Sequence, residues 1–375
     1  MPEAPPDLFT AATAYARGDE KAAGAINPAR PELGEEAEQT TRQVLKRVFE
    51  RGWLPDDLYE LARRRFDEFG TSYLLDSLAI YVDPYAPETV DARWLEGLDA
   101  KVWWSRTEPH LGQWAAKQVL IGEEVVAAVI EVLGQLLRLP TLNLILSLPG
   151  TVRKETAHVH HGVDEKKLGR VRALLAKAES SSFPEEAEAL TGKAQELMTR
   201  YALDRALVEA ETGVNTDAFV TRRLWLETPH LDAKSLLVQV VSAANRCRAL
   251  FHGEFGFVSV LGDEDDVDAV LLLTTSLLLQ ATKATLASGK KATRAYRKSF
   301  LVAYASRIGE RLEQARMTIT AGQPSLLPVL ATHQAKVDET FERVFPAKVG
   351  KRVSVRSGEG WEAGRAAADQ ATLDG

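Results

Sequence analysis

The most suggestive chemistry in this sequence is a row of basic side chains between residues 288 and 316. The segment holds eight lysines and arginines against two acids, Glu310 and Glu313, which leaves a local excess of six positive charges. Guanidinium groups set in a row bind phosphate groups well, because their planar forks match the phosphate oxygens. The alternative is an ordinary solvated helix face whose arginine stems cover apolar surface. The candidate anion-binding residues are Arg294, Arg297, Lys298, Arg307 and Arg311.

A histidine cluster offers a second kind of chemistry. His158, His160 and His161 form an H-x-H-H pattern, with Asp164 nearby. In an extended segment, imidazoles two residues apart point to the same side, where they could seat zinc or nickel. Because no cysteine or further histidine follows at a standard ligand spacing, a histidine-rich linker without metal is the alternative.

Acidic residues crowd a third place, residues 263–268, directly after a predicted strand. Carboxylates at the carboxyl end of a strand can hold magnesium. The same acids in the first turn of a helix stabilise the helix dipole and supply an N-cap, which is the stronger interpretation. The metal-ligand candidates of the whole chain are therefore His158, His160, Asp263 and Asp266.

Signals for other chemistry are weaker. Arg246 and Arg248 flank Cys247 and could lower the pKa of its thiol, but a small buried residue on a predicted helix is the commoner role. A second basic run, residues 343–356, is typical of a flexible arm on an acidic partner or of a solvated connector. The helices on either side of Gly52–Pro55 have only the outline of a helix-turn-helix. Because G-x-S-x-G, H-E-x-x-H, Walker and G-x-G-x-x-G motifs are missing from the sequence, we expect no cofactor and lean toward a protein that is not an enzyme.

Composition bounds the class of protein. The chain has 375 residues, 45% of them hydrophobic, and a formal net charge of −7. The length predicts more than one packed domain. The negative net charge argues against a protein that binds nucleic acid over its whole surface. The single cysteine and an N-terminus without a signal-peptide pattern predict a cytoplasmic protein. Charged residues and a proline interrupt the apolar stretch from Val125 to Leu148, so we expect no membrane span there.

Hydrophobic periodicity predicts the elements that must position these residues. The expected fold class is predominantly α-helical α+β, with a helical N-terminal unit, an αα-hairpin and a small β-α-β-α-α domain. In that domain we expect strands over 219–227 and 255–261 and a helix over 233–250 between them. The predicted boundaries are a loosely ordered arm at 1–35, an all-helical domain at 36–150, a linker at 151–163, the hairpin at 164–212, the α+β domain at 216–320, and a C-terminal helix with a basic tail at 321–375.

The hairpin resembles a known family. LGRVRALLAKAES, a break at Phe183–Pro184 and EEAEALTGKAQELMTRYAL are similar to the bacterial and phage domain of unknown function twenty-seven eighty-six. The later stretch YRKSFLVAYASRIGERLEQAR resembles the α+β domain that accompanies it, so the likeness covers residues 164–317. The resemblance implies this fold and a genomic neighbourhood with mobile elements. It implies no established activity.

The function we expect is therefore a non-enzymatic binding protein that contacts an anionic partner, such as nucleic acid, through the arginine-rich helix. The N-terminal helical domain is the expected site for a protein partner. Two alternatives stay open: a metal-dependent hydrolase or nuclease, and a protein-interaction scaffold without a ligand.

Overall fold

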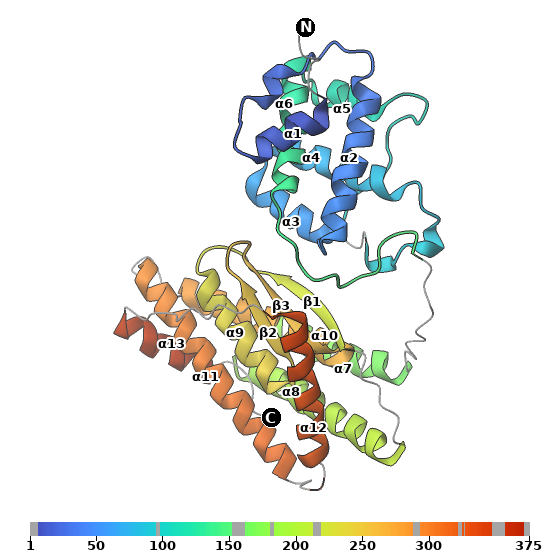
Figure 1. Cartoon of the computed structure of the whole chain (residues 1–375). Coiled ribbons are helices and arrows are strands. Elements are labelled where there is room, and N and C mark those ends of the chain that lie inside the picture. The colour runs from blue at the N-terminus through green and yellow to red at the C-terminus, as the bar shows by residue number, and fades with distance from the viewer. Residues whose placement is uncertain are drawn as a thin grey trace. The chain divides into compact units, whose positions relative to one another are not determined.

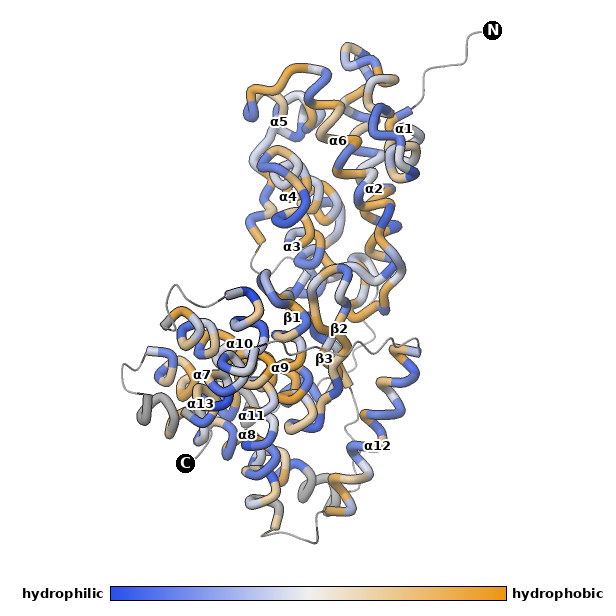
Figure 2. Tube along the Cα trace, turned by 90° about the vertical axis from the view of Figure 1, so that its left-hand side faces the viewer, coloured by the Kyte–Doolittle hydropathy of each residue, from blue (hydrophilic) through white to orange (hydrophobic). Residues whose placement is uncertain are grey.

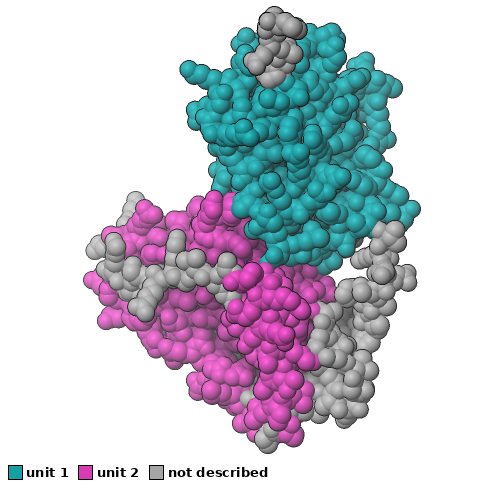
Figure 3. Space-filling view, in the orientation of Figure 1, with its two compact units in different colours: residues 1–157 teal, residues 158–375 magenta. Residues whose placement is uncertain are grey.

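The computed structural model describes residues 7–94, 98–151, 162–180, 184–212, 219–287, 293–321, 325, 327–346 and 357–370. The described elements are mostly helices with one small antiparallel sheet, which confirms the predicted fold class. The chain forms two compact units, residues 1–157 and residues 158–375 (Figure 3).

Unit 1 is all helical. Within the segment expected to be a loosely ordered arm with room for one short helix, residues 8–16 form helix α1, in which Leu8, Ala11 and Ala12 are buried against the rest of the unit. Asp7 begins this helix, because its side chain accepts a hydrogen bond from the backbone N–H of Thr10 at 2.6 Å. The elements are α1 (Leu8–Ala16), η1 (Ala22–Ala25), α2 (Leu33–Glu50), α3 (Pro55–Arg65), α4 (Glu68–Val82), η2 (Pro87–Thr89), η3 (Ala92–Trp94), α5 (His110–Gln118) and α6 (Gly122–Leu137) (Figure 1).

Aromatic side chains fill the core of unit 1. The ring of Phe49 meets the edge of Trp94 at 5.1 Å between centroids, and Tyr73 meets Trp114 at 5.2 Å. All four side chains are buried. Aromatic pairs of this kind hold segments together even where a helical apolar face is missing. The weakly periodic stretch between α4 and α5 is therefore anchored in part by Trp94, at its start.

Unit 2 combines the hairpin with the mixed domain. Strands β1 and β2 each pair antiparallel with β3, so the sheet order is β1-β3-β2. Because α9 joins β1 to β2 across the intervening β3, the arrangement is a split β-α-β unit. The elements are α7 (Gly162–Ser180), α8 (Pro184–Thr212), β1 (Phe219–Trp225), α9 (Leu231–Ala244), β2 (Arg248–His252), β3 (Phe257–Asp263), α10 (Glu264–Ala287), α11 (Arg294–Ala321), α12 (Leu327–Val344) and α13 (Gly358–Gln370) (Figure 1).

Strand β2 was not predicted, and the helix expected over 233–250 is shorter. Helix α9 ends at Ala244, and Arg246 adopts a left-handed backbone with φ of 59°. This conformation cannot continue a right-handed helix, so the chain turns and enters β2. Cys247, expected on a helix face, lies instead in the connection between α9 and β2. There it packs so closely on Gly262 that a Cβ at Gly262 would come within 2.6 Å of its sulfur.

The hairpin and the mixed domain share one hydrophobic core. Val171 and Ala194 of the hairpin lie in the same buried cluster as Leu237 of α9, Val258 of β3 and Ile308 of α11. Figure 2 shows hydrophobic residues concentrated along α9 and the strands of this unit. A buried hydrogen bond joins the two parts as well, since Gln195 Nε2 donates to Asn245 Oδ1 at 2.9 Å. The hairpin thus packs as a layer of unit 2.

Helix α10 is apolar for most of its length. Among the described residues it is the one helix, over Glu264–Leu286, with the length and composition to cross a membrane. One side of it, with Val270, Leu273 and Leu277, is buried in the core of unit 2. Those contacts are the ones expected of a core helix in a packed domain.

Small residues let α13 lie directly on the backbone of α11. Gly360, Gly364 and Ala368 recur every four residues, so they occupy one face of α13. A Cβ at Gly360 would come within 2.4 Å of the carbonyl oxygen of Tyr296, and one at Gly364 within 2.2 Å of that of Phe300. The close approach therefore depends on the missing side chains.

Replacing Gly364 by alanine is expected to loosen α13 from α11. The new methyl group would overlap a backbone oxygen, which cannot move without distorting α11. We expect a loss of about 1–3 kcal/mol in the free energy of unfolding by urea, the usual cost of overpacking. Hydrogen exchange should accelerate in residues 358–370.

Gly169→Ala in α7 is the matched control, because a Cβ there meets nothing within 4 Å. It should be neutral or stabilise the chain by about 0.5–1 kcal/mol, since alanine is the better helix former. Equal losses in the two variants would refute close packing as the cause.

Candidate functional site

The five candidate anion-binding residues all lie on α11, but three of them are already bound to other protein groups. Arg311 is only 5% exposed, and its guanidinium donates to the carbonyl oxygens of Ala368 and Asp369 on α13. Arg307 is paired with Glu310 at 2.8 Å and with the Asp369 carboxylate. Lys298 is paired with Asp232. These three side chains fasten α11 to α13 and α9.

The other two candidates, Arg294 and Arg297, are exposed in the first turn of α11. Within the residues that the structure describes, neither guanidinium has a carboxylate at ion-pair distance. The apolar stripe of the helix, with Tyr304 and Ile308, is buried further along. The first turn therefore extends past the core and presents its two arginines to solvent.

Positive charge converges at this end of unit 2. Helix α9 begins beside it, after His230, whose backbone has φ of 67°. Burial lowers the pKa of His230, and the nearby charges of Arg294, Lys234 and Lys298 lower it further, against the opposing effect of Asp232. We call the starts of α9 and α11 the basic surface. It carries the two exposed arginines, Arg294 and Arg297. Beside them, Lys298 is paired with Asp232 and Lys234 donates to the carbonyl oxygen of Glu227.

The acids predicted as metal ligands are neutralised by cations of the protein. Asp266 is buried and lies 2.8 Å from Arg205 of α8 and 2.9 Å from Arg246. Asp263 lies 3.2 Å from Arg205 and 2.7 Å from Nε2 of His333 on α12. Burial alone would raise the pKa of Asp266, but the two guanidinium groups outweigh it and hold that pKa below its ordinary value.

This cluster joins α8, β3, α10 and α12, so its evident role is to hold layers of unit 2 together. In the described part of the chain, no group of three or more histidine, cysteine, aspartate or glutamate side chains is arranged to hold a metal ion. Glu264 and Asp268 of the same helical turn pair with Arg222. The predicted ligands His158 and His160 lie outside the described residues, as do residues 347–356 of the second basic run.

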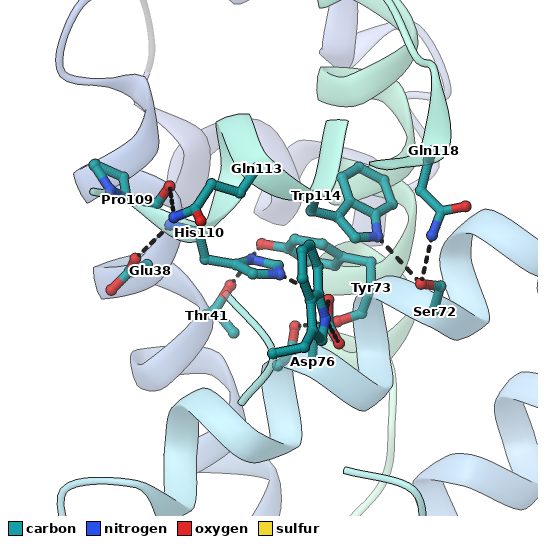
Figure 4. A network of polar contacts seen from close by, with 12 residues as sticks. Glu38, Thr41, Ser72, Tyr73, Asp76, Pro109, His110, Gln113, Trp114 and Gln118 are labelled. Atoms are coloured by element: carbon teal, nitrogen blue, oxygen red, sulfur yellow. Dashed lines mark hydrogen bonds and ion pairs between the residues drawn. The ribbon is translucent and has the colours of Figure 1, made fainter. Parts of the chain in front are cut away.

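Sequence reasoning missed a buried polar network in unit 1, shown in Figure 4. His110 Nε2 lies 2.7 Å from Asp76 Oδ2, and the indole N–H of Trp103 donates to both oxygens of Asp76 at 3.0 Å. The backbone N–H of His110 donates to Glu38 at 2.9 Å. The network therefore ties the start of α5 to α2 and α4.

The surroundings of this network indicate a structural role. His110 is 1% exposed, and the rings of Trp103 and Trp104 pack against it with centroids 6.0 and 4.4 Å away. Among the described residues, no serine, threonine or cysteine side chain is hydrogen-bonded to His110. To act in catalysis, a histidine–aspartate pair must be reached by a substrate, a water molecule or a protein nucleophile. The pair holds α5 instead.

Two other features from the sequence are also buried. Burial raises the pKa of the Cys247 thiol well above its ordinary value, so the flanking arginines do not activate it. In the connection between α2 and α3, Trp53 is fully buried and donates its indole N–H to Pro140 at 2.8 Å. That connection therefore packs inside unit 1, unlike the exposed turn and recognition helix of a DNA-binding motif.

The fold and these sites define a mostly helical protein of two units, the second of which builds a helical hairpin onto a split β-α-β sheet. Residues 166–205 match the family model described as protein of unknown function (DUF2786). The chain thus carries a DUF2786 domain, formed by the α7–α8 hairpin, and the resemblance seen in the sequence is confirmed there. No curated protein and no solved structure matches the chain.

Proposed function

We propose that this chain is a non-enzymatic binding protein that contacts nucleic acid through the basic surface at the starts of α9 and α11. The observation that carries the proposal is the pair Arg294 and Arg297. Both are exposed, and within the described residues neither has a carboxylate at ion-pair distance. Charges that a protein leaves unneutralised on its surface are available to an anionic partner.

The chemistry of this surface suits phosphate groups. Two guanidinium groups three residues apart lie on neighbouring positions of one helix. Arginine offers paired N–H donors, which match two oxygens of one phosphate. Because base-reading side chains are not needed for such contacts, the expected binding is salt-dependent and largely independent of sequence.

Replacing Arg294 and Arg297 together by alanine is expected to weaken binding roughly tenfold at low salt, because two phosphate contacts are lost. The slope of log K against log salt should fall by about 1.8 on duplex DNA, since each contact contributes about 0.9. Fluorescence anisotropy with labelled single- and double-stranded DNA and RNA, over a range of salt concentrations, measures both quantities.

Arg307→Ala combined with Arg365→Ala is the matched control. Arg307 lies on α11, as the two tested arginines do, and Arg365 lies on α13; both pair with Glu310. Their removal should change affinity and salt slope little, because their charges are already compensated. The proposal fails if the protein binds none of the four nucleic acids at low salt, or if the Arg294/Arg297 variant binds as the unmodified protein does.

A further inference from the structure

The outer side of α10 carries almost no charge along its second half. Between residues 275 and 286, the exposed side chains are Thr275, Leu279, Thr282, Lys283 and Leu286. Lys283 is turned toward α7, because its ammonium donates to the carbonyl oxygen of Glu179 at 3.1 Å. The other four residues are uncharged. A helix on the surface of a folded domain normally turns charged residues to solvent, so this face departs from the usual pattern.

The hydroxyl groups of the two threonines are used inside the helix. Thr275 Oγ1 donates to the carbonyl oxygen of Leu271 at 2.8 Å, and Thr282 Oγ1 donates to that of Leu278 at 2.7 Å. Hydrogen bonds of this kind satisfy the hydroxyl without a partner from outside the helix. Covering either threonine therefore leaves no donor unsatisfied. The face can be buried as an apolar surface, although half of its four residues are polar by type.

The four residues have the spacing of a seam between two helices. The steps from Thr275 to Leu279, to Thr282 and to Leu286 are four, three and four residues long, so the side chains lie in one narrow stripe. This alternation of three and four is the pattern by which one helix packs lengthwise on another. We call these four residues the α10 seam. Its natural partner is a helix with the same spacing.

We propose that the α10 seam packs against the α10 seam of a second copy of the chain, with the two helices antiparallel. A twofold axis between residues 280 and 281 places Thr275 of one copy opposite Leu286 of the other, and Leu279 opposite Thr282. Every large side chain then faces a small one, which is how facing layers interdigitate. Parallel pairing would instead set leucine against leucine and threonine against threonine. An uncharged face is also its own complement, as a twofold contact requires.

Sedimentation velocity on the full chain tests self-association. Because the seam is short, we expect a reversible dimer whose fraction rises with protein concentration in the micromolar range. Leu279→Lys should raise the dimer dissociation constant at least roughly tenfold, since it places two like charges beside the twofold axis. Leu327→Lys is the matched control, because Leu327 is 47% exposed and Leu279 is 40% exposed, but Leu327 lies on α12. The control should associate as the unmodified chain does.

Two results would overturn the proposal. In the first, the unmodified chain stays monomeric at every concentration, including the case in which it binds neutral phosphatidylcholine vesicles and the seam contacts lipid. In the second, Leu279→Lys dimerises as tightly as Leu327→Lys. Circular dichroism should show the same helix content in both variants and the unmodified chain, because both leucines are exposed.

Disulfide trapping tests the antiparallel arrangement. A mixture of the Thr275→Cys chain and the Leu286→Cys chain should form a covalent dimer on mild oxidation, because the two positions face each other across the seam. Either chain alone should not, since its two new thiols lie about 16 Å apart along the helix axis, beyond the reach of a disulfide. The native Cys247 is buried and does not compete. If either chain alone is trapped as efficiently as the mixture, the antiparallel seam is wrong.

Discussion

Replacing Asp76 by alanine is expected to cost about 1–3 kcal/mol of unfolding free energy, the usual loss when a buried polar group is left without its hydrogen-bond partner. The change leaves His110 and the indole N–H of Trp103 without their acceptor. His110 cannot turn to water, because it is 1% exposed and enclosed by aromatic rings. The loss should therefore approach the full cost of an unsatisfied buried group.

Urea denaturation followed by tryptophan fluorescence is a suitable measurement for unit 1. Five of the seven tryptophans of the chain belong to it: Trp53, Trp94, Trp103, Trp104 and Trp114. Hydrogen exchange then locates the change, which should be largest in α4 and α5. Tyr73 lies in the same region, where burial raises the pKa of its phenol to about 12. Looser packing around Tyr73 should therefore lower that pKa.

Asp83→Ala is the matched control for this unit. Asp83 ends α4 and pairs with Arg106, whose side chain is 69% exposed. An exposed pair contributes less than about 1 kcal/mol, so this variant should be nearly as stable as the unmodified chain. Should Asp76→Ala lose no more stability than Asp83→Ala, the network in Figure 4 would not be what fastens α5.

The sequence predicted the helices and the fold class because hydrophobic periodicity is a local signal. It failed at β2, where the apolar residues of the expected helix continue without a break into Ala249 and Leu250. What ends the helix is the left-handed backbone of Arg246, and arginine is not a residue type that signals such a conformation. The sequence signal for strand β2 lay further along the chain, in Gly253 and Gly256, which mark the turn between β2 and β3.

The candidate site was predictable only as a set of residue types. Sequence gives the eight basic residues of segment 288–316, but it does not give their partners. Lys298 meets Asp232 from 66 residues away, and Arg307 meets Asp369 from 62 residues away. Tertiary contacts therefore decide which of these basic side chains form ion pairs with carboxylates and which do not. The same holds for Asp76 and His110, which are 34 residues apart and belong to no local motif.

Replacing Asp266 by alanine is expected to destabilise unit 2 by about 3–5 kcal/mol, because it leaves the guanidinium of Arg246 without its carboxylate and beside Arg205. Arg246 is the more affected, since its side chain is 12% exposed and donates to both oxygens of Asp266. The contacts also join α8 of the hairpin to α10, so we expect faster hydrogen exchange in both helices. Urea denaturation followed by circular dichroism measures the loss.

Acid provides an independent check on this prediction. The pKa of Asp266 lies below its ordinary value in the folded chain, so its contribution is present above the unfolded pKa of about 3.9. That contribution is lost as pH falls through the lower folded value. The stability difference between the unmodified chain and Asp266→Ala should therefore be smaller in acid than at neutral pH.

The neighbouring residue separates the effect of burial from that of charge. Asp265 lies in the same helical turn and 3.8 Å from Arg205, but its side chain is 46% exposed. Water screens such a pair, so Asp265→Ala should cost less than about 1 kcal/mol. A loss of stability in Asp265→Ala as large as that in Asp266→Ala would instead mean that the net charge of the first turn of α10 stabilises the junction between the hairpin and the sheet, and that the buried contact with Arg246 does not.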